Sequence, residues 1–145
     1  MARIVVDASV VVQWFLEEPH SNSARRLRDD YVADDIDLDA PAVLPFEVLN
    51  AVRFGAGFRA GELSRVVDML GRFGIPLHHL EGPFAEVVAD LTDTSRLTVY
   101  DASYMGLAKV LGVPVYTADE AMIRAKPEGV RVLHVREYPG AERVG

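Results

Sequence analysis

Short runs of β-branched and aromatic residues alternate with helical patterns along the whole chain, and this alternation restricts the available folds. Strands are expected at residues 3–6, 36–38, 75–80, 113–116 and 130–135. Helices are expected at residues 10–16, 19–32, 45–58, 63–73, 83–91, 98–111 and 119–125. Strands that alternate with helices form βαβ units, whose strands are parallel and whose helices cover both faces of the sheet. The sequence therefore predicts an α/β fold with a mostly parallel central sheet.

The chain has the length of one such domain. It contains 145 residues, and no repeat, low-complexity tract or linker interrupts them. We therefore expect residues 1–145 to form a single domain. The sequence has no cysteine, which excludes disulfide bonds and metal sites built from thiolates.

No segment has the pattern of a membrane span. The most apolar stretch, residues 4–16, is interrupted by Asp7, Ser9 and Gln13. It is shorter than the ~20 residues that a transmembrane helix requires, and no cleavage site of a signal peptide follows it. We expect a cytoplasmic protein that does not associate with a membrane.

The formal net charge of −7 disfavours a passive, basic nucleic-acid-binding protein. It is compatible with an enzyme that binds a metal ion through carboxylates. Seven arginines are candidates for contacts with phosphate, although a solvated helix face is the better explanation for most of them. These are Arg25, Arg26, Arg28, Arg53, Arg59, Arg65 and Arg72.

Four acidic residues are expected at one edge of the predicted sheet. Asp7 and Asp119 each come directly after a predicted strand. Glu47 and Asp101 lie in the first turns of predicted helices. In an open parallel sheet, helices that follow strands begin at the carboxyl edge, which is where ligands bind. We therefore expect the four carboxylates to converge in one crevice.

Each of these acids also has a structural explanation. Asp7 and Asp119 are suited to cap the helices that they precede, and Asp101 completes a capping-box pattern with Thr98. Glu47 is suited to complement a helix dipole. Together, however, four carboxylates repel one another unless a cation or protons neutralise them. Oxygen ligands without histidine or cysteine favour Mg²⁺ or Mn²⁺, and such clusters support phosphoryl chemistry.

Three polar residues accompany the acids. Asn50 follows Glu47 by three residues and shares its helix face. Ser9 and Thr117 each lie two residues from one of the aspartates. We expect these side chains either to hold a metal-bound water or to form local hydrogen bonds in turns and caps.

Four short motifs in this order resemble those of the PIN-domain ribonucleases, in particular the VapC-type toxins of toxin–antitoxin pairs. The first motif is Val5-Val6-Asp7-Ala8-Ser9, and the second is Glu47-x-x-Asn50. The third covers residues 97–104 and contains Asp101, and the fourth covers residues 115–119 and ends at Asp119. The motifs run from the first predicted strand to residue 119, so the resemblance covers nearly the whole domain.

The resemblance implies a three-layer sandwich and an endoribonuclease that cuts single-stranded or loop RNA with Mg²⁺ or Mn²⁺. It implies that Asp7, Glu47, Asp101 and Asp119 form an acidic quartet that binds the metal. In the family mechanism an activated water attacks phosphorus in line and leaves 5′-phosphate and 3′-hydroxyl ends. The resemblance also implies a homodimer and a small VapB-like antitoxin that blocks the site.

Two other functions are open at this point. One is a catalytically silent PIN-like module that binds RNA or a protein partner, although such a module has no need of four mutually repelling acids. The other is a haloacid-dehalogenase-like phosphatase, which also places an aspartate after its first strand. That chemistry usually uses a second acid two residues later, where this sequence has Ser9. RNA cleavage, RNA binding without cleavage, and phosphate release from small esters distinguish the three.

Overall fold

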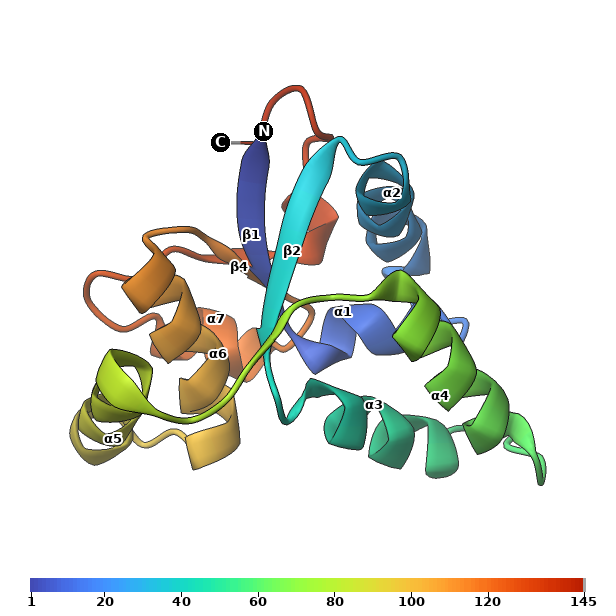
Figure 1. Ribbon diagram of the computed structural model, residues 1–145, viewed down its shortest axis with the longest axis horizontal. Coiled ribbons are helices and arrows are strands. Elements are labelled where there is room, and N and C mark those ends of the chain that lie inside the picture. Colours follow the sequence, from blue (N-terminus) through green and yellow to red (C-terminus); the bar gives the residue numbers. More distant parts are fainter. Residues whose placement is uncertain (145) are drawn as a thin grey trace.

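The computed structural model describes residues 1–144 and contains a five-stranded parallel sheet with helices on both sides (Figure 1). The strands are β1 (Ala2–Val6), β2 (Ile36–Pro41), β3 (Leu77–His78), β4 (Val115–Thr117) and β5 (Val132–His134). The helices are α1 (Ala8–Val12), α2 (Ser21–Val32), α3 (Leu44–Arg53), α4 (Glu62–Phe73), α5 (Gly82–Thr94), α6 (Val99–Leu111) and α7 (Glu120–Ala125), followed by the 3-10 turn η1 (Val135–Glu137). Every strand pairing is parallel, which confirms the predicted fold class.

The strand order places a topological switch at the centre of the sheet. The order is β3-β2-β1-β4-β5, so the chain builds outward from β1 on one side and then returns to its other side with β4. Val6 at the end of β1 pairs with Tyr116 of β4. Ligands of open α/β sheets bind beyond the carboxyl ends of the strands at such a switch point. The residues that follow β1 and β4 therefore lie where a ligand is expected to bind.

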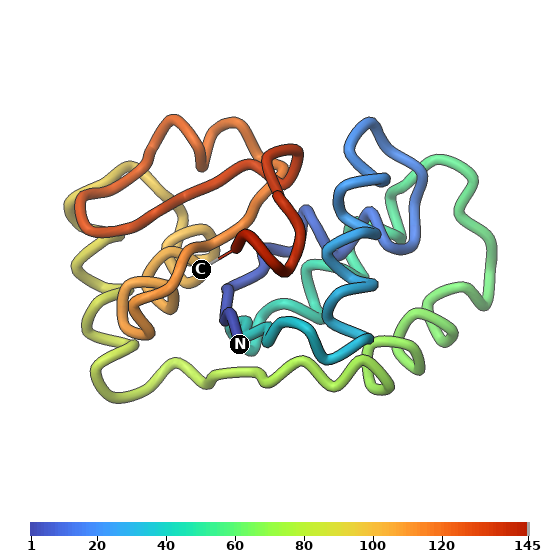
Figure 2. Tube along the Cα trace, turned by 90° about the horizontal axis from the view of Figure 1, so that it is seen from above, coloured from blue at the N-terminus to red at the C-terminus, as the bar shows by residue number. Residues whose placement is uncertain are grey.

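The helices form the outer layers. Helix α6 packs against β1 and β2 and carries α5 on its outer side, whereas α2 packs against β2 and η1. Figures 1 and 2 show α5 and α6 on one side of the sheet, and α2 and α4 on the other. Helix α3 lies between α1 and α4 beyond the carboxyl ends of β1 and β2. This is the three-layer arrangement that the family resemblance implies.

The centre of the core consists of β1 and α6. Ile4, Val5 and Val6 are fully buried, as expected for a central parallel strand. Residues 102–108 of α6 are buried all around the helix because α5 covers its outer face. Gly106 allows this close approach, since a Cβ atom at its position would lie 2.9 Å from Cγ2 of Val88 in α5. Asp7, directly after β1, and Asp101, in the first turn of α6, are therefore attached to the most buried part of the molecule.

Several boundaries differ from the predicted ones. Helix α1 begins at Ala8 and ends at Val12, earlier than predicted at both ends, because Asp7 caps it. Helix α3 ends at Arg53 rather than near residue 58, because the chain turns at Gly55 and takes a positive φ of 79° at Gly57. Strand β2 extends to Pro41 because it pairs with strands on both sides, and β3 is reduced to two residues at the sheet edge. None of the helices within residues 1–144 has the length and hydrophobicity needed to cross a membrane.

Candidate active site

Asp7 lies at the switch point, directly after β1, and only 5% of it is exposed. Its Oδ2 atom accepts hydrogen bonds from the Ser9 hydroxyl (2.5 Å), the Thr117 hydroxyl (2.9 Å) and the Ser9 amide (3.3 Å). The amide contact is the N-cap that was expected for this residue. Since these donors all contact Oδ2, the cap fixes the carboxylate and leaves Oδ1 available to a ligand.

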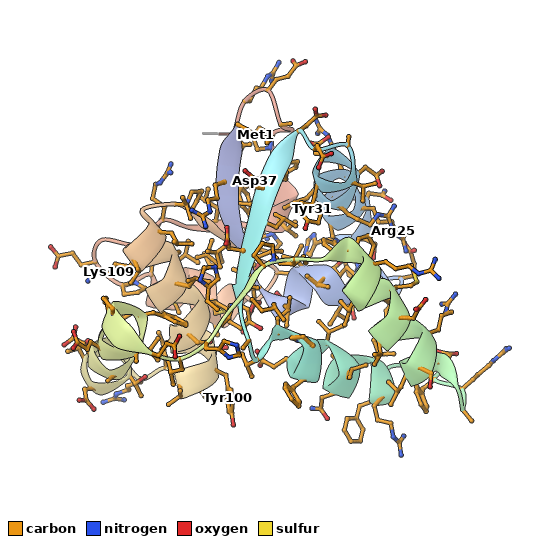
Figure 3. The ribbon with its side chains drawn as sticks, in the orientation of Figure 1. Met1, Arg25, Tyr31, Asp37, Tyr100 and Lys109 are labelled. Atoms are coloured by element: carbon orange, nitrogen blue, oxygen red, sulfur yellow. The ribbon has the colours of Figure 1, made fainter. Side chains whose placement is uncertain are left out.

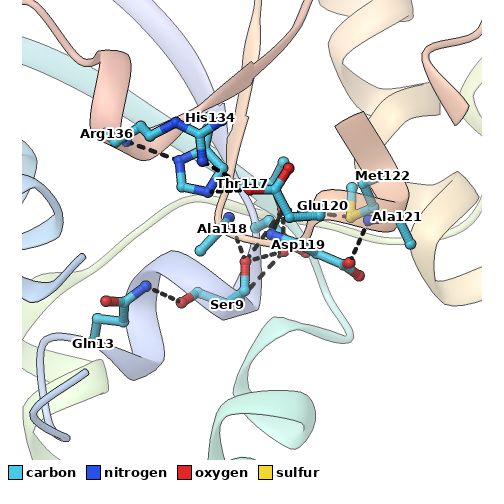
Figure 4. Close-up of polar contacts among 11 residues, drawn as sticks. Ser9, Gln13, Thr117, Ala118, Asp119, Glu120, Ala121, Met122, His134 and Arg136 are labelled. Carbon is cyan, nitrogen blue, oxygen red and sulfur yellow. Dashed lines mark hydrogen bonds and ion pairs between the residues drawn. The ribbon is translucent and has the colours of Figure 1, made fainter. Parts of the chain in front are cut away.

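Ser9 and Thr117 join the ends of β1 and β4 (Figure 4). The Ser9 hydroxyl accepts from the Ala118 amide at 2.8 Å, and the Thr117 hydroxyl accepts from the Asp119 amide at 3.0 Å. The two hydroxyl oxygens are 3.2 Å apart. Both side chains thus support Asp7 directly while holding the segment that carries Asp119.

Glu47 lines the cavity from the first turn of α3, and Pro45 lies in the same turn. Its Oε1 atom accepts a hydrogen bond of 2.7 Å from the hydroxyl of Tyr104, a fully buried residue of α6. Burial and the charges of Asp7 and Glu47 raise the pKa of Tyr104, so this hydroxyl stays protonated and donates. The sequence motifs did not single out Tyr104 as a partner of Glu47. A buried tyrosine hydroxyl requires a partner, and this was the available signal.

Asp101 and Asp119 occupy the starts of α6 and α7. The hydroxyl of Thr98 accepts from the Asp101 amide at 3.1 Å, and the carboxylate of Asp119 accepts from the Ala121 amide at 2.8 Å. The cap of α6 therefore uses the backbone of Asp101 and not its carboxylate. Figure 3 shows Tyr100, the neighbour of Asp101, projecting outward from this end of α6.

All four predicted acids line one cavity of about 350 Å³. Its walls are Asp7, Ala8, Ser9, Val12, Glu18, Glu47, Ala51, Asp101, Ala118 and Asp119. Glu18 is a fifth carboxylate in the wall, and no sequence motif pointed to it. Asn50, in contrast, is exposed on α3 and is not part of the cavity wall. The structure thus brings the quartet, Ser9 and Ala118 together and leaves Asn50 outside.

Burial, and then the charge of a neighbouring carboxylate, raises the pKa of three acids of the cavity. Burial raises the pKa of Asp7 to about 6, and the charge of Glu47 adds to this rise, whereas the hydrogen bonds from Ser9 and Thr117 oppose it. Burial also raises the pKa of Glu47, with a further contribution from the charge of Asp101. The pKa of Asp101 is raised by burial and then by the charge of Asp119. The negative charges of the four acids therefore repel one another, and a cation bound among them would relieve this repulsion.

The donor set fits a hard divalent cation. The cavity presents carboxylate oxygens and hydroxyls, with neither histidine nor cysteine in its wall. Within residues 1–144 no three acidic or histidine side chains are already close enough to share one ion. Binding an ion therefore requires the carboxylates to move toward it, which the free Oδ1 of Asp7 and the partial exposure of Glu47 and Asp101 permit.

A parallel three-layer α/β fold with an acidic cavity at its switch point is an arrangement suited to metal-dependent enzymes that act on phosphate esters. Within that class, this chain belongs to the PIN domain family, whose model matches residues 4–127. The haloacid-dehalogenase-like alternative is therefore wrong.

Named relatives and solved structures agree with this assignment. The ribonuclease VapC12 of Mycobacterium tuberculosis is 33% identical over 119 residues, which is 80% of this chain and 86% of the relative. The ribonuclease VapC3 of the same organism is 34% identical over 130 residues, which is 86% of this chain and 88% of the relative. The structure of VapBC2 from Rickettsia felis, bound to a promoter DNA fragment, matches with a TM-score of 0.68 at 8% identity. That match covers 91% of this chain and 98% of the other, and it shows a shared fold.

Proposed function

We propose that this protein is a metal-dependent endoribonuclease and the toxin of a toxin–antitoxin pair. The observation that carries the proposal is the convergence of Asp7, Glu47, Asp101 and Asp119, from four separate parts of the chain, in one cavity. The relatives VapC12 and VapC3 are named ribonucleases, which supports RNA as the substrate. A silent binding module would gain nothing from four carboxylates that repel one another.

The four carboxylates are the proposed ligands of Mg²⁺ or Mn²⁺, which when bound supplies positive charge for the phosphate and lowers the pKa of a water. Asp7 is the fixed member of the set, because Ser9 and Thr117 hold its Oδ2 atom and leave Oδ1 free to bind the ion. Tyr104 holds Oε1 of Glu47, so Oε2 remains available in the cavity.

In the proposed reaction the carboxylates orient the attacking water in line with the bond between phosphorus and the 3′ oxygen. The water gives up a proton to one of the site carboxylates as its oxygen forms a bond to phosphorus. The bond between phosphorus and the 3′ oxygen breaks, and the 3′ oxygen takes up a proton from solvent. The products carry 5′-phosphate and 3′-hydroxyl ends. Ser9 and Thr117 act as positioning residues for Asp7 in this scheme, and Tyr104 does the same for Glu47.

We further infer that residues 1–145 form one PIN domain that works in the cytoplasm. The partners that we propose are a VapB-like antitoxin that covers the cavity and a second copy of this chain in a homodimer. The solved VapBC2 complex of Rickettsia felis supports the choice of an antitoxin as partner.

The test is cleavage of total RNA by purified protein free of any co-purified partner. We expect cleavage with Mg²⁺ or Mn²⁺, none in EDTA, and none by Asp7→Asn or Asp101→Asn in either metal. If the wild-type protein cuts in EDTA, or if either variant cuts at the wild-type rate, the proposed mechanism is wrong.

A further inference from the structure

Helix α3 carries an exposed aromatic side chain on the same side as its catalytic glutamate. Phe54, the residue at which α3 ends, is 77% exposed. It follows Glu47 by seven residues, which is two helical turns, so the two side chains share one face about 10 Å apart along the axis. Ala51, between them, lines the acidic cavity. The face of α3 therefore leads from the cavity directly to Phe54.

An arginine is stacked at the same place. The guanidinium of Arg53 lies 5.7 Å from the ring centroid of Phe54 and 5.1 Å from that of Phe58. None of the ion pairs formed within residues 1–144 involves Arg53, so no carboxylate there neutralises it. Arg53 and Phe54 are exposed to solvent, and Phe58 is half-buried against the core beside them. We refer to Arg53, Phe54 and Phe58 as the α3 platform.

The acidic cavity alone cannot hold a polyanion, because its carboxylates repel phosphates. Affinity for a strand must come in part from groups outside it. Aromatic rings stack on bases of any sequence, and arginine adds both a cation and a planar stacking surface. Proteins that bind single-stranded nucleic acids combine these two elements. The α3 platform has both, at a short distance along the helix from the site acids.

We propose that the α3 platform is a subsite for single-stranded RNA, in which a base next to the cleaved bond stacks on Phe54 while Arg53 contacts its phosphate. This inference rests on the proposed ribonuclease function and adds how the strand is held.

Phe46 is a matched control on the same helix. It is 75% exposed, nearly the same as Phe54, but it faces a different environment. Phe46 lines an apolar groove with Leu49 of α3 and with Val67 and Leu70 of α4. Truncating it removes a similar ring without touching the side of α3 that faces the acidic cavity.

The test measures binding of a fluorescein-labelled single-stranded oligoribonucleotide of mixed sequence, by anisotropy in Mg²⁺. Asp7→Asn serves as the background, because it is expected to leave the RNA uncut. Adding Phe54→Ala should weaken binding at least about fivefold, given what one stacked base contributes. Phe54→Trp should retain affinity, and Phe46→Ala should leave it unchanged. Arg53→Gln should reduce the slope of log affinity against log salt by about 0.7, as expected for one lost phosphate contact.

Equal affinities for the Phe54→Ala and Phe46→Ala proteins would overturn the subsite. So would a change in oligomeric state or antitoxin binding by Phe54→Ala with RNA affinity intact, since the platform would then be a protein interface. Wild-type cleavage of total RNA, measured in parallel, separates the two claims. If the wild-type protein cleaves RNA and Phe54→Ala binds RNA as tightly as its Asp7→Asn background, the subsite is wrong but the proposed function stands. If the wild-type protein neither cleaves nor binds RNA, the proposed function is wrong as well.

Discussion

Replacing Asp7 with asparagine should stabilise the metal-free protein while abolishing its activity. Asp7 is 5% exposed, and its surroundings raise its pKa from an ordinary 3.8 to about 6. At 1.36 kcal/mol per pKa unit, ionised Asp7 then destabilises the folded state by about 3 kcal/mol at pH values well above 6. Asparagine carries no charge, so the variant lacks this unfavourable contribution.

The Asp7→Asn substitution should keep the hydrogen bonds that Asp7 accepts. The three hydrogen bonds to Asp7 all end on one oxygen, Oδ2, and the amide oxygen of asparagine can accept them in the same place. Asparagine is also a good N-cap, so α1 keeps its first turn. A neutral acceptor forms weaker hydrogen bonds than a carboxylate, and we therefore expect a net gain of about 1–3 kcal/mol at neutral pH.

The gain should depend on pH in a defined direction. Folded Asp7 keeps its proton up to a pH of about 6, whereas the unfolded chain releases it near 3.8. The contribution of this group to stability is therefore fully present below about pH 4 and is lost as the pH rises through 6. The difference between variant and wild type should be near zero at about pH 4 and largest above about pH 7.

Urea unfolding in EDTA at several pH values measures this difference. Glu86→Gln, which removes a negative charge from an exposed position on α5, is the control and should show no such pH dependence. An Asp7→Asn protein that is less stable than wild type at neutral pH would refute the reasoning. A gain that does not change with pH would refute it equally, because it would not arise from the titration of Asp7.

Two further predictions concern buried contacts. Tyr104→Phe removes the 2.7 Å hydrogen bond to Glu47 and should slow RNA cleavage about tenfold, the rate equivalent of one lost hydrogen bond. Tyr138→Phe is the control and should leave the rate unchanged, because its hydrogen-bond partner Asp30 lies outside the cavity wall. Equal rates for wild type and Tyr104→Phe in single-turnover assays would show that Glu47 needs no support. Gly106→Ala should destabilise the protein by about 1–3 kcal/mol in thermal or urea unfolding, since its Cβ atom would lie 2.9 Å from Cγ2 of Val88; unaltered stability would show that α5 and α6 separate easily.

The fold was predictable because its signals are local. The alternation of strand and helix patterns gave the parallel sheet, and individual caps fixed several boundaries. Thr98 caps α6 through the Asp101 amide, and Gly112 ends the same helix in the left-handed region. The boundaries that failed depend on tertiary structure, as in β2, whose length is set by its pairing with β1 and β3.

The site was predictable to the extent that topology determines it. Asp7 and Asp119 follow neighbouring parallel strands, so their proximity follows from the sheet. The roles of other residues required side-chain geometry. Helical periodicity placed Asn50 near Glu47, but α3 is rotated so that Ala51 faces the cavity instead. Glu18 enters the cavity from an irregular segment after α1, for which no periodic pattern exists.

The chemistry of the RNA ends tests the central claim most directly, because it reports how the bond was broken. Fragments produced by the wild-type protein in Mn²⁺ should carry 5′-phosphate and 3′-hydroxyl ends, as attack by a water held among Asp7, Glu47, Asp101 and Asp119 requires. The Asp7→Asn protein should produce no fragments under the same conditions. Fragments with 2′,3′-cyclic phosphate and 5′-hydroxyl ends would show that the 2′-hydroxyl is the nucleophile, and this would contradict the assignment of the acidic cavity as the site of hydrolysis.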